Sequence, residues 1–347
     1  MKTFRIAVGI ILPMSAHLLV SAASLEFSKL PPLPDREGFA GAFAGVTDGS
    51  LVVAGGANFP DKKPWENGKK FWYDTVFALE KPTATWKVVG KLPRPLGYGV
   101  SVTTRNGIVF IGGSDAEKHH AEVFRLTLRN GQLETQDLPG LPVPVANGAG
   151  ALLGNTIYVF GGSDEPGDKS ALNHLCAFDL DSPHAQWREL EPCPGKPRIL
   201  PVAAVLDGAF YIAGGAGLEQ TNGKVARIYL RDAWSYRPDS GWKRLSDLPK
   251  PVVAAPTPAP VAGSKFFIIG GDDGSNVGFQ PLDKHPGFSK SMLIYDAKSN
   301  CWNVAEQVPA PRAVLPTVFW QGGWVMPNGE ARPGVRSPEV WSFTPGR

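Results

Sequence analysis

Phe266-Phe267-Ile268-Ile269-Gly270-Gly271 is an apolar run that ends in two glycines, and the chain repeats this arrangement along its length. The other glycine pairs are Gly55-Gly56, Gly112-Gly113, Gly161-Gly162 and Gly214-Gly215. Successive pairs are about 50 to 60 residues apart, a period typical of propellers and similar arrays of one repeated unit. At the sixth place in this rhythm stands Asn328-Gly329-Glu330, and the spacing predicts that Glu330 replaces the second glycine.

Each unit also repeats one internal order of segments. A small or apolar strand comes first, then a turn with Gly or Asp, then the strand that ends in the glycines. A third strand carries an aromatic residue, and a fourth carries a tryptophan in most units. The expected first strands are 40–46, 98–103, 146–152, 201–206, 255–261 and 314–320, and the tryptophans are Trp86, Trp187, Trp242 and Trp302. The second unit has Leu133-Glu134-Thr135-Gln136 in place of a tryptophan strand.

This order of glycine pair, aromatic residue and tryptophan resembles that of kelch repeats, and the resemblance covers residues 25–347. It implies an all-β fold, a six-bladed kelch β-propeller formed by residues 24–347. The last unit ends after its third strand, at Trp341-Ser342-Phe343. We expect residues 25–34, at the N-terminal end, to supply the fourth strand of that blade and its exit, because joining both ends in one blade removes free sheet edges.

Composition agrees with many short strands and excludes one class of partner. The chain has 347 residues with 43% hydrophobic content, 40 glycines and 33 prolines, which favours strands and turns over helices. Its net charge of +3 comes from dispersed basic residues and argues against nucleic acid binding. The three cysteines cannot all pair, and neither they nor the scattered histidines have metal-ligand spacing.

Residues 1–23 have the pattern of an export signal. Lys2 and Arg5 precede a mostly apolar run from Ile6 to Val20, and Ser21-Ala22-Ala23 supplies small residues for cleavage. Cleavage predicts a periplasmic or secreted protein that has no membrane attachment. The alternative is a segment retained as an anchor, although the run is short for a membrane span.

Long loops and basic linkers are expected on one face of the propeller. In a four-stranded antiparallel blade, the loop after the second strand and the linker into the next blade leave on the same face. The linkers carry Arg36, Arg94, Arg198 and Arg312, and the first long loop carries Asn58 and Lys69. Guanidinium groups bind carboxylates well, so these residues are candidate ligands for an anion, with structural contacts of the linkers as the alternative. Phe59, Trp65 and Trp72 could stack on a sugar ring or pack their loop.

A second resemblance concerns the sixth unit. The segment Asn328-Gly329-Glu330-Ala331-Arg332-Pro333-Gly334-Val335-Arg336 is similar to a segment of bacterial N-acetylneuraminate epimerases, the sialic acid mutarotases. The stretches 38–45, 55–59, 66–69 and 97–101 resemble the same family, but here they precede the glutamate segment, as in a cyclically permuted branch. The resemblance implies that Glu330 is the proton acceptor and that Arg336 is its functional partner. The chemistry of the reaction adds that Arg336 together with Arg332 could hold the carboxylate of the sugar acid or stabilise charge at the opening ring.

The chemistry of such a reaction suits these residues. Mutarotation removes a proton from the anomeric hydroxyl and protonates the ring oxygen, so it requires a positioned acid–base group and neither a cofactor nor a metal. The alternatives are an ion pair between Glu330 and Arg336 that only holds the loop, a sugar-binding module without catalysis, and a kelch scaffold that binds proteins. A copper radical oxidase is disfavoured because its ligand set cannot be assembled from this sequence.

Overall fold

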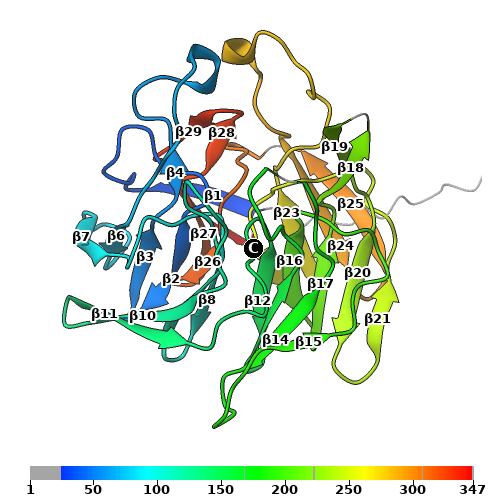
Figure 1. Cartoon of the computed structure of the whole chain (residues 1–347), viewed down its shortest axis with the longest axis horizontal. Helices are drawn as coiled ribbons and strands as arrows, with labels where there is room; N and C mark the ends of the chain where they lie inside the picture. Colours follow the sequence, from blue (N-terminus) through cyan, green and yellow to red (C-terminus); the bar gives the residue numbers. More distant parts are fainter. Residues whose placement is uncertain (1–24, 168, 222, 307, 346–347) are drawn as a thin grey trace, which may run out of the picture.

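The computed structural model describes residues 25–345 except 168, 222 and 307. Six four-stranded antiparallel sheets surround one axis, and two short 3-10 helices, η1 (Pro64–Glu66) and η2 (Leu282–Lys284), lie in loops (Figure 1). The predicted all-β, six-bladed propeller is confirmed. The expected signal segment 1–23 lies outside the described residues. Within the described part of the chain, no helix has the length and apolar character needed to cross a membrane.

The blades follow the order of the chain, each with its first-named strand nearest the axis. Blade 1 contains β2 (Phe43–Thr47), β3 (Ser50–Ala54), β6 (Thr75–Leu79) and β7 (Lys87–Lys91). Blade 2 contains β8 (Val100–Thr104), β9 (Gly107–Ile111), β10 (Val123–Arg129) and β11 (Gln132–Leu138). Blade 3 contains β12 (Ala149–Leu153), β13 (Thr156–Phe160), β14 (Leu175–Asp179) and β15 (Arg188–Leu190).

The other three blades repeat this plan. Blade 4 contains β16 (Val202–Leu206), β17 (Ala209–Ala213), β20 (Ala233–Arg237) and β21 (Gly241–Arg244). Blade 5 contains β22 (Val261–Ala262), β23 (Lys265–Ile269), β24 (Ser291–Asp296) and β25 (Cys301–Glu306). Blade 6 contains β26 (Val318–Trp320), β27 (Gly323–Pro327), β30 (Val340–Pro345) and β1 (Leu25–Leu30).

Blade 6 is closed by the two ends of the described chain. Strand β1 pairs antiparallel with β30, so that Leu25 lies opposite Pro345 and Leu30 lies opposite Val340. The rings of Phe27 and Phe343 are 5.3 Å apart across this pair. The predicted fourth strand from the N-terminal end is therefore confirmed, and the ring of blades has no open seam.

The core consists of apolar layers between neighbouring blades. Phe43 of blade 1 stacks on Phe110 of blade 2 with their centroids 4.8 Å apart, and both side chains are fully buried. Burial of each such side chain contributes on the order of 1.5–3 kcal/mol to folding.

Outer tryptophans join blades 1, 3, 4 and 5 to the exit of the preceding blade. The indole Nε1 of Trp86 donates to the carbonyl of Pro31, and that of Trp187 donates to the carbonyl of Pro139. The corresponding bonds in blades 4 and 5 run from Trp242 to Glu191 and from Trp302 to Ser246. Blade 2 forms its outer strand β11 without a tryptophan, and there Leu133 packs against the core instead.

A closed ring of six backbone hydrogen bonds surrounds the axis. Each linker contributes one residue whose N–H donates to the carbonyl of its counterpart in a neighbouring blade, with N–O distances of 2.7–3.0 Å. In chain order the six residues are Gly41, Tyr98, Asn147, Leu200, Ala254 and Val314. All six have left-handed backbone conformation, with φ between 53° and 64°. They line an axial cavity of about 60 Å³.

The structure corrects the predicted register of the sixth repeat. Glu330 forms a β-bridge with Ala313 just as Ala57 does with Ala40, so Glu330 follows the glycine-pair position and does not occupy it. Asn328 stands where the other repeats have their first glycine, and its φ of 56° is close to the 64° of Gly55. Asparagine adopts this left-handed conformation more readily than most residues, which allows it to replace glycine there.

Asn328→Gly is expected to retain or raise stability. The Asn328 side chain is 1% exposed, and its amide oxygen and nitrogen have no hydrogen-bond partner among the described residues. Glycine fits the backbone and removes this unpaired amide, which should stabilise the fold by about 1 kcal/mol after the entropic cost of glycine is included. Urea denaturation of the variant and the wild type measures the difference. A loss above about 1 kcal/mol would contradict this account of Asn328.

Candidate functional site

The sixth glycine-pair position leads into a two-stranded hairpin. Strands β28 (Glu330–Arg332) and β29 (Val335–Arg336) pair so that Glu330 lies opposite Arg336. Gly334 supplies the turn with φ of 80°. The backbone of Glu330 is bonded in both directions to Ala313, directly before the ring residue Val314. The hairpin therefore stands on the linker face of the propeller, close to the axis.

The carboxylate of Glu330 is held from two sides. Nη1 of Arg336 donates to Oε1 at 2.6 Å, and the backbone N–H of Gly334 donates to the same oxygen at 2.9 Å. The side chains are 16% exposed for Glu330 and 5% exposed for Arg336. The second oxygen, Oε2, makes neither contact. The arrangement orients the carboxylate group and leaves one of its oxygens for another partner.

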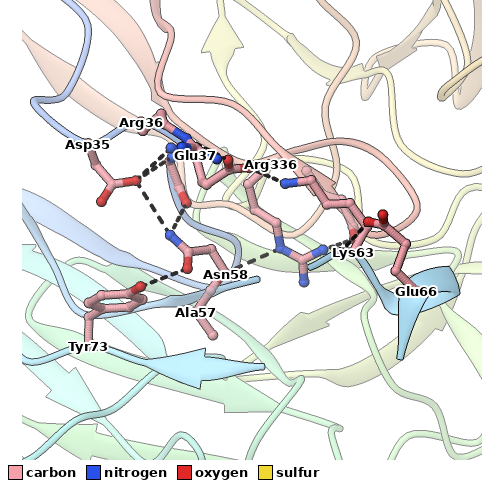
Figure 2. A network of polar contacts seen from close by, with 11 residues as sticks. Asp35, Arg36, Glu37, Ala57, Asn58, Lys63, Glu66, Tyr73 and Arg336 are labelled. Carbon is pink, nitrogen blue, oxygen red and sulfur yellow. Dashed lines mark hydrogen bonds and ion pairs between the residues drawn. The ribbon is translucent and has the colours of Figure 1, made fainter. Parts of the chain in front are cut away.

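Arg336 is itself fixed by the first long loop of blade 1. Its Nε donates to the carbonyl of Ala57 at 3.4 Å, as Figure 2 shows, and its guanidinium lies 4.8 Å from the ring centroid of Phe59. Ala57 belongs to β4 (Ala57–Asn58), which pairs with β5 (Phe71–Trp72). Arg336 thus positions Glu330 and cannot rotate away without losing contacts to a neighbouring blade.

Asn58 has a structural place beside the site. Its amide nitrogen donates to the carbonyl of Gly38 at 3.0 Å and to Asp35, and its oxygen accepts from the hydroxyl of Tyr73 at 2.8 Å (Figure 2). The residue is 1% exposed. These bonds hold the linker from blade 6 to blade 1, which favours a role in closing the ring over the predicted contact with a ligand.

Arg332 joins two loops above the hairpin. Its guanidinium lies 6.0 Å from the ring of Trp65 in the blade 1 loop, and its Nη1 donates to the carbonyl of Asp283 in the blade 5 loop at 2.5 Å. In Figure 1 the blue loop that holds η1 and the gold loop that holds η2 both rise above β28 and β29, at the top of the view. Arg332 therefore lies at the site but is already engaged.

The three aromatic residues considered for sugar stacking each lie against a basic side chain. The guanidinium of Arg336 lies over the ring of Phe59, and that of Arg332 lies over the ring of Trp65. The ammonium of Lys70 lies 5.1 Å from the ring of Trp72. Lys70 also lies 5.0 Å from the ring of Tyr98. Cation–π contacts therefore shape this part of the surface. The predicted ligand Lys69 is exposed and lies next to the lysine that makes these contacts.

The four linker arginines lie apart from the pair formed by Glu330 and Arg336. Arg198 is 0% exposed and bonded to Asp232, and Arg312 is 8% exposed and bonded to Glu339 at 2.7 Å. Arg94 bonds Glu122 at 2.9 Å, and the 84% exposed side chain of Arg36 bonds Glu37. In the described part of the chain, none of the four has a polar contact with Glu330 or Arg336. The structural alternative is favoured for Arg198 and Arg312.

A second acidic group occupies the position of Glu330 in the neighbouring blade. Asp272 bridges to Val253 as Glu330 bridges to Ala313, and the hydroxyl of Tyr229 donates to its Oδ2 at 2.5 Å. Burial and this carboxylate raise the pKa of Tyr229 well above its usual value. The sequence pattern of Asp272-Asp273-Gly274 allowed an ordinary turn, and nothing in it predicted Tyr229 as a partner.

Asp273 anchors the blade 5 loop, and we expect its carboxylate to make the free energy of unfolding depend on pH in the acid range. Burial alone would raise its pKa, but hydrogen bonds from Ser275 and Lys250 lower the pKa to about 2. Because the folded pKa is below the unfolded value near 4, the carboxylate stabilises the fold above about pH 4 and loses this effect as the pH falls toward 2. Asp273→Asn should lower the unfolding free energy by about 1 kcal/mol at pH 7.

Denaturation of wild type and Asp273→Asn at pH 7 and near pH 2.5 measures this linkage. The difference between them should shrink at the lower pH. The exposed Asp61 provides the control, because Asp61→Asn should change little at either pH. A difference for Asp273→Asn that stays constant with pH would contradict the assigned origin of the pKa shift.

Comparison with known proteins shows two overlapping family matches. The model of the N-acetylneuraminate epimerase family matches residues 11–135, and the model of the KLHDC2/KLHL20/DRC7 Kelch-repeats domain matches residues 100–322. An N-acetylneuraminate epimerase from Haemophilus influenzae (strain PittEE) is 33% identical over 231 residues, which cover 59% of this chain and 58% of that protein. One from Salmonella enteritidis PT4 is 43% identical over 122 residues, 31% of each chain.

The solved structure of YjhT is similar in fold, with a TM-score of 0.66 and 14% sequence identity, over 90% of this chain and 96% of that one. The fold, the linker-face site and the match over more than half of the chain define a kelch propeller, and the chain belongs to the kelch-repeat family. Within it, the predicted resemblance to N-acetylneuraminate epimerases is confirmed. The aligned part spans 58% of the length of the Haemophilus relative.

Proposed function

We propose that the protein is a mutarotase that interconverts the anomers of N-acetylneuraminate by acid–base ring opening and closure. The observation that carries this proposal is the Glu330 carboxylate, which Arg336 and Gly334 orient through one oxygen while the other makes neither contact. A loop anchor alone would not require a carboxylate in this position, because the other five repeats form the same β-bridge with residues as small as Ala57 or Ser114.

The chemistry requires one proton to move between two oxygens of the substrate. Oε2 of Glu330 takes the proton of the anomeric hydroxyl, and the protonated carboxyl returns it to the ring oxygen as the bond between that oxygen and the anomeric carbon breaks. Both substrate oxygens are bonded to the same carbon, so one carboxylate can serve both. The open keto form then recloses on the other face. Arg336 holds the carboxylate of Glu330 in place between turnovers.

The similarity to N-acetylneuraminate epimerases of Haemophilus and Salmonella supports the substrate class. The export pattern of residues 1–23 supports cleavage of a signal peptide and a periplasmic or secreted location, where a sugar acid released outside the cytoplasm would be encountered. The cyclically permuted order of the motifs is compatible with a ring whose two ends meet in blade 6.

Proton NMR of freshly dissolved N-acetylneuraminate tests the proposal. Added protein should speed the approach to anomeric equilibrium without changing the final ratio, and it should do so more strongly for this acid than for neutral aldoses. Unchanged rates, together with binding of the sugar acid, would identify a sugar-binding module. Unchanged rates without binding would favour a scaffold for protein partners.

A further inference from the structure

Recognition of the sugar acid requires a cation for its carboxylate, and the positive groups beside Glu330 are mostly engaged. The guanidinium of Arg336 bonds Glu330 and Ala57 and stacks on Phe59. That of Arg332 bonds the Asp283 carbonyl and stacks on Trp65. Arg336 has both Nε and Nη1 engaged, so it cannot form the two parallel hydrogen bonds by which arginine usually holds a carboxylate, and Arg332 already uses Nη1 to join two loops.

Lys70 is different. Its ammonium lies 5.1 Å from the centroid of the Trp72 ring and 5.0 Å from that of Tyr98. No carboxylate among the described residues forms an ion pair with it. A cation–π contact at an exposed site contributes only about 0.5–1 kcal/mol, so the ammonium keeps its hydrogen-bonding capacity for an incoming anion.

The pleat of the β4–β5 ribbon places Lys70 on the same side as Arg336. Trp72 lies opposite Ala57, so their side chains share one face of the ribbon. Side chains alternate between the two faces, so Phe59 and Lys70, each two residues farther along the ribbon, are expected on that same face. The Arg336 guanidinium lies over the ring of Phe59 on this face and also donates to the backbone carbonyl of Ala57. The side chain of Lys69 is expected on the opposite face of the ribbon.

Tyr98 places the ammonium near the axis. Tyr98 is a member of the hydrogen-bonded ring and lines the axial cavity, so a cation over its ring stands close to the centre of the linker face. The hydroxyl of Tyr98 and the indole Nε1 of Trp72 are both buried and have no hydrogen-bond partner within the described chain. Two unpaired donors beside an unpaired cation indicate the place of an acceptor group.

We infer that Lys70 is the residue that binds the carboxylate of the substrate, with the Tyr98 hydroxyl and the Trp72 indole as further donors at the same place. This inference rests on the proposed function for the identity of the ligand. It assigns recognition of the acid group to blade 1 and proton transfer to blade 6. The anomeric carbon, which bears the carboxylate, is then held between them.

Kinetics of Lys70→Gln with two substrates test the inference. With N-acetylneuraminate we expect KM to rise roughly 10- to 100-fold while kcat stays within about twofold, because a charge-assisted contact made before and during reaction is lost. With the methyl ester, which lacks the negative charge, wild type and variant should be alike. Lys70→Arg should restore most of the affinity, and Lys62→Gln, an exposed lysine of the same loop, is the matched control.

The outcomes separate this inference from the proposed function. Equal effects of Lys70→Gln on acid and ester, or no effect on either, in an active wild type would overturn the role of Lys70 and leave the mutarotase intact. If wild type binds the acid by saturation-transfer NMR without catalysis, and Lys70→Gln weakens that binding at least tenfold, the inference stands while the catalytic proposal fails. An absence of both catalysis and binding would refute both.

Discussion

Replacing Glu330 by glutamine is expected to abolish catalysed anomer exchange. The glutamine side chain has nearly the same shape, and its amide oxygen can still accept from Arg336 and Gly334, but it cannot take a proton from a sugar hydroxyl at neutral pH. General acid–base catalysis contributes typically about 10²–10⁴-fold, so Glu330→Gln should lose on the order of that acceleration. Proton NMR of anomeric equilibration measures the loss directly.

Folding must be followed in the same variant, because the pair is largely buried. Glu330→Gln leaves the Arg336 charge without a counter-ion, but retained bonds to Ala57 and stacking on Phe59 limit the damage, so the thermal midpoint should stay near that of wild type. Glu66→Gln, an exposed glutamate of the blade 1 loop, should keep full activity. Full activity in a folded Glu330→Gln protein would remove Glu330 from the mechanism.

Replacing Arg198 by alanine is expected to destabilise the fold more than any other single change considered. Its guanidinium bonds both oxygens of Asp232, at 2.9 and 2.6 Å, and also the carbonyls of Gly214 and Lys196. Burial would raise the pKa of Asp232, but bonds from Arg198 and Trp234 overcome this and keep the pKa low. Arg198→Ala leaves a buried carboxylate without its cation, a change that costs about 3–5 kcal/mol.

Denaturant titration of Arg198→Ala measures this cost, and two further variants identify its origin. Arg198→Met combined with Asp232→Leu removes both charges and should recover part of the lost stability. Arg36→Ala, at the 84% exposed linker arginine, should change the unfolding free energy by less than about 0.5 kcal/mol. If Arg198→Ala were as stable as wild type but weak in binding the sugar acid, Arg198 would belong to substrate recognition after all.

Much of the fold could be predicted because the residues that repeat in the sequence have local structural roles. The glycine pairs recur where the chain turns from the second strand, and the outer tryptophans recur where one blade is fastened to the next. The predicted register of the sixth repeat was wrong because Asn328 takes the place of the first glycine, and asparagine can adopt the same left-handed conformation. The outer strand of blade 2 followed from its position in the repeat, since Leu133 can fill the core without the indole bond.

The candidate site was predictable only in part. The pairing of Glu330 with Arg336 followed from their resemblance to a known segment, and their hairpin is local in sequence. In contrast, Arg198 finds Asp232 through contacts that no repeat pattern records. Whether Lys69 or Lys70 is the better candidate ligand depends on which face of the β4–β5 ribbon is turned to the axis. The register of the strand pair decides this, and the sequence does not show that register.

The ring of six backbone hydrogen bonds limits which molecules can pass along the axis of the propeller. Its cavity of about 60 Å³ is far smaller than the roughly 300–1,000 Å³ of pockets that enclose small molecules, so a sugar cannot cross it. A wider recess of about 410 Å³ lies farther along the first strands, and Ser101 and Gly150 line both spaces. A sugar that binds at Glu330 is therefore expected to enter and to leave on the linker face, and both anomers would use the same side of the propeller.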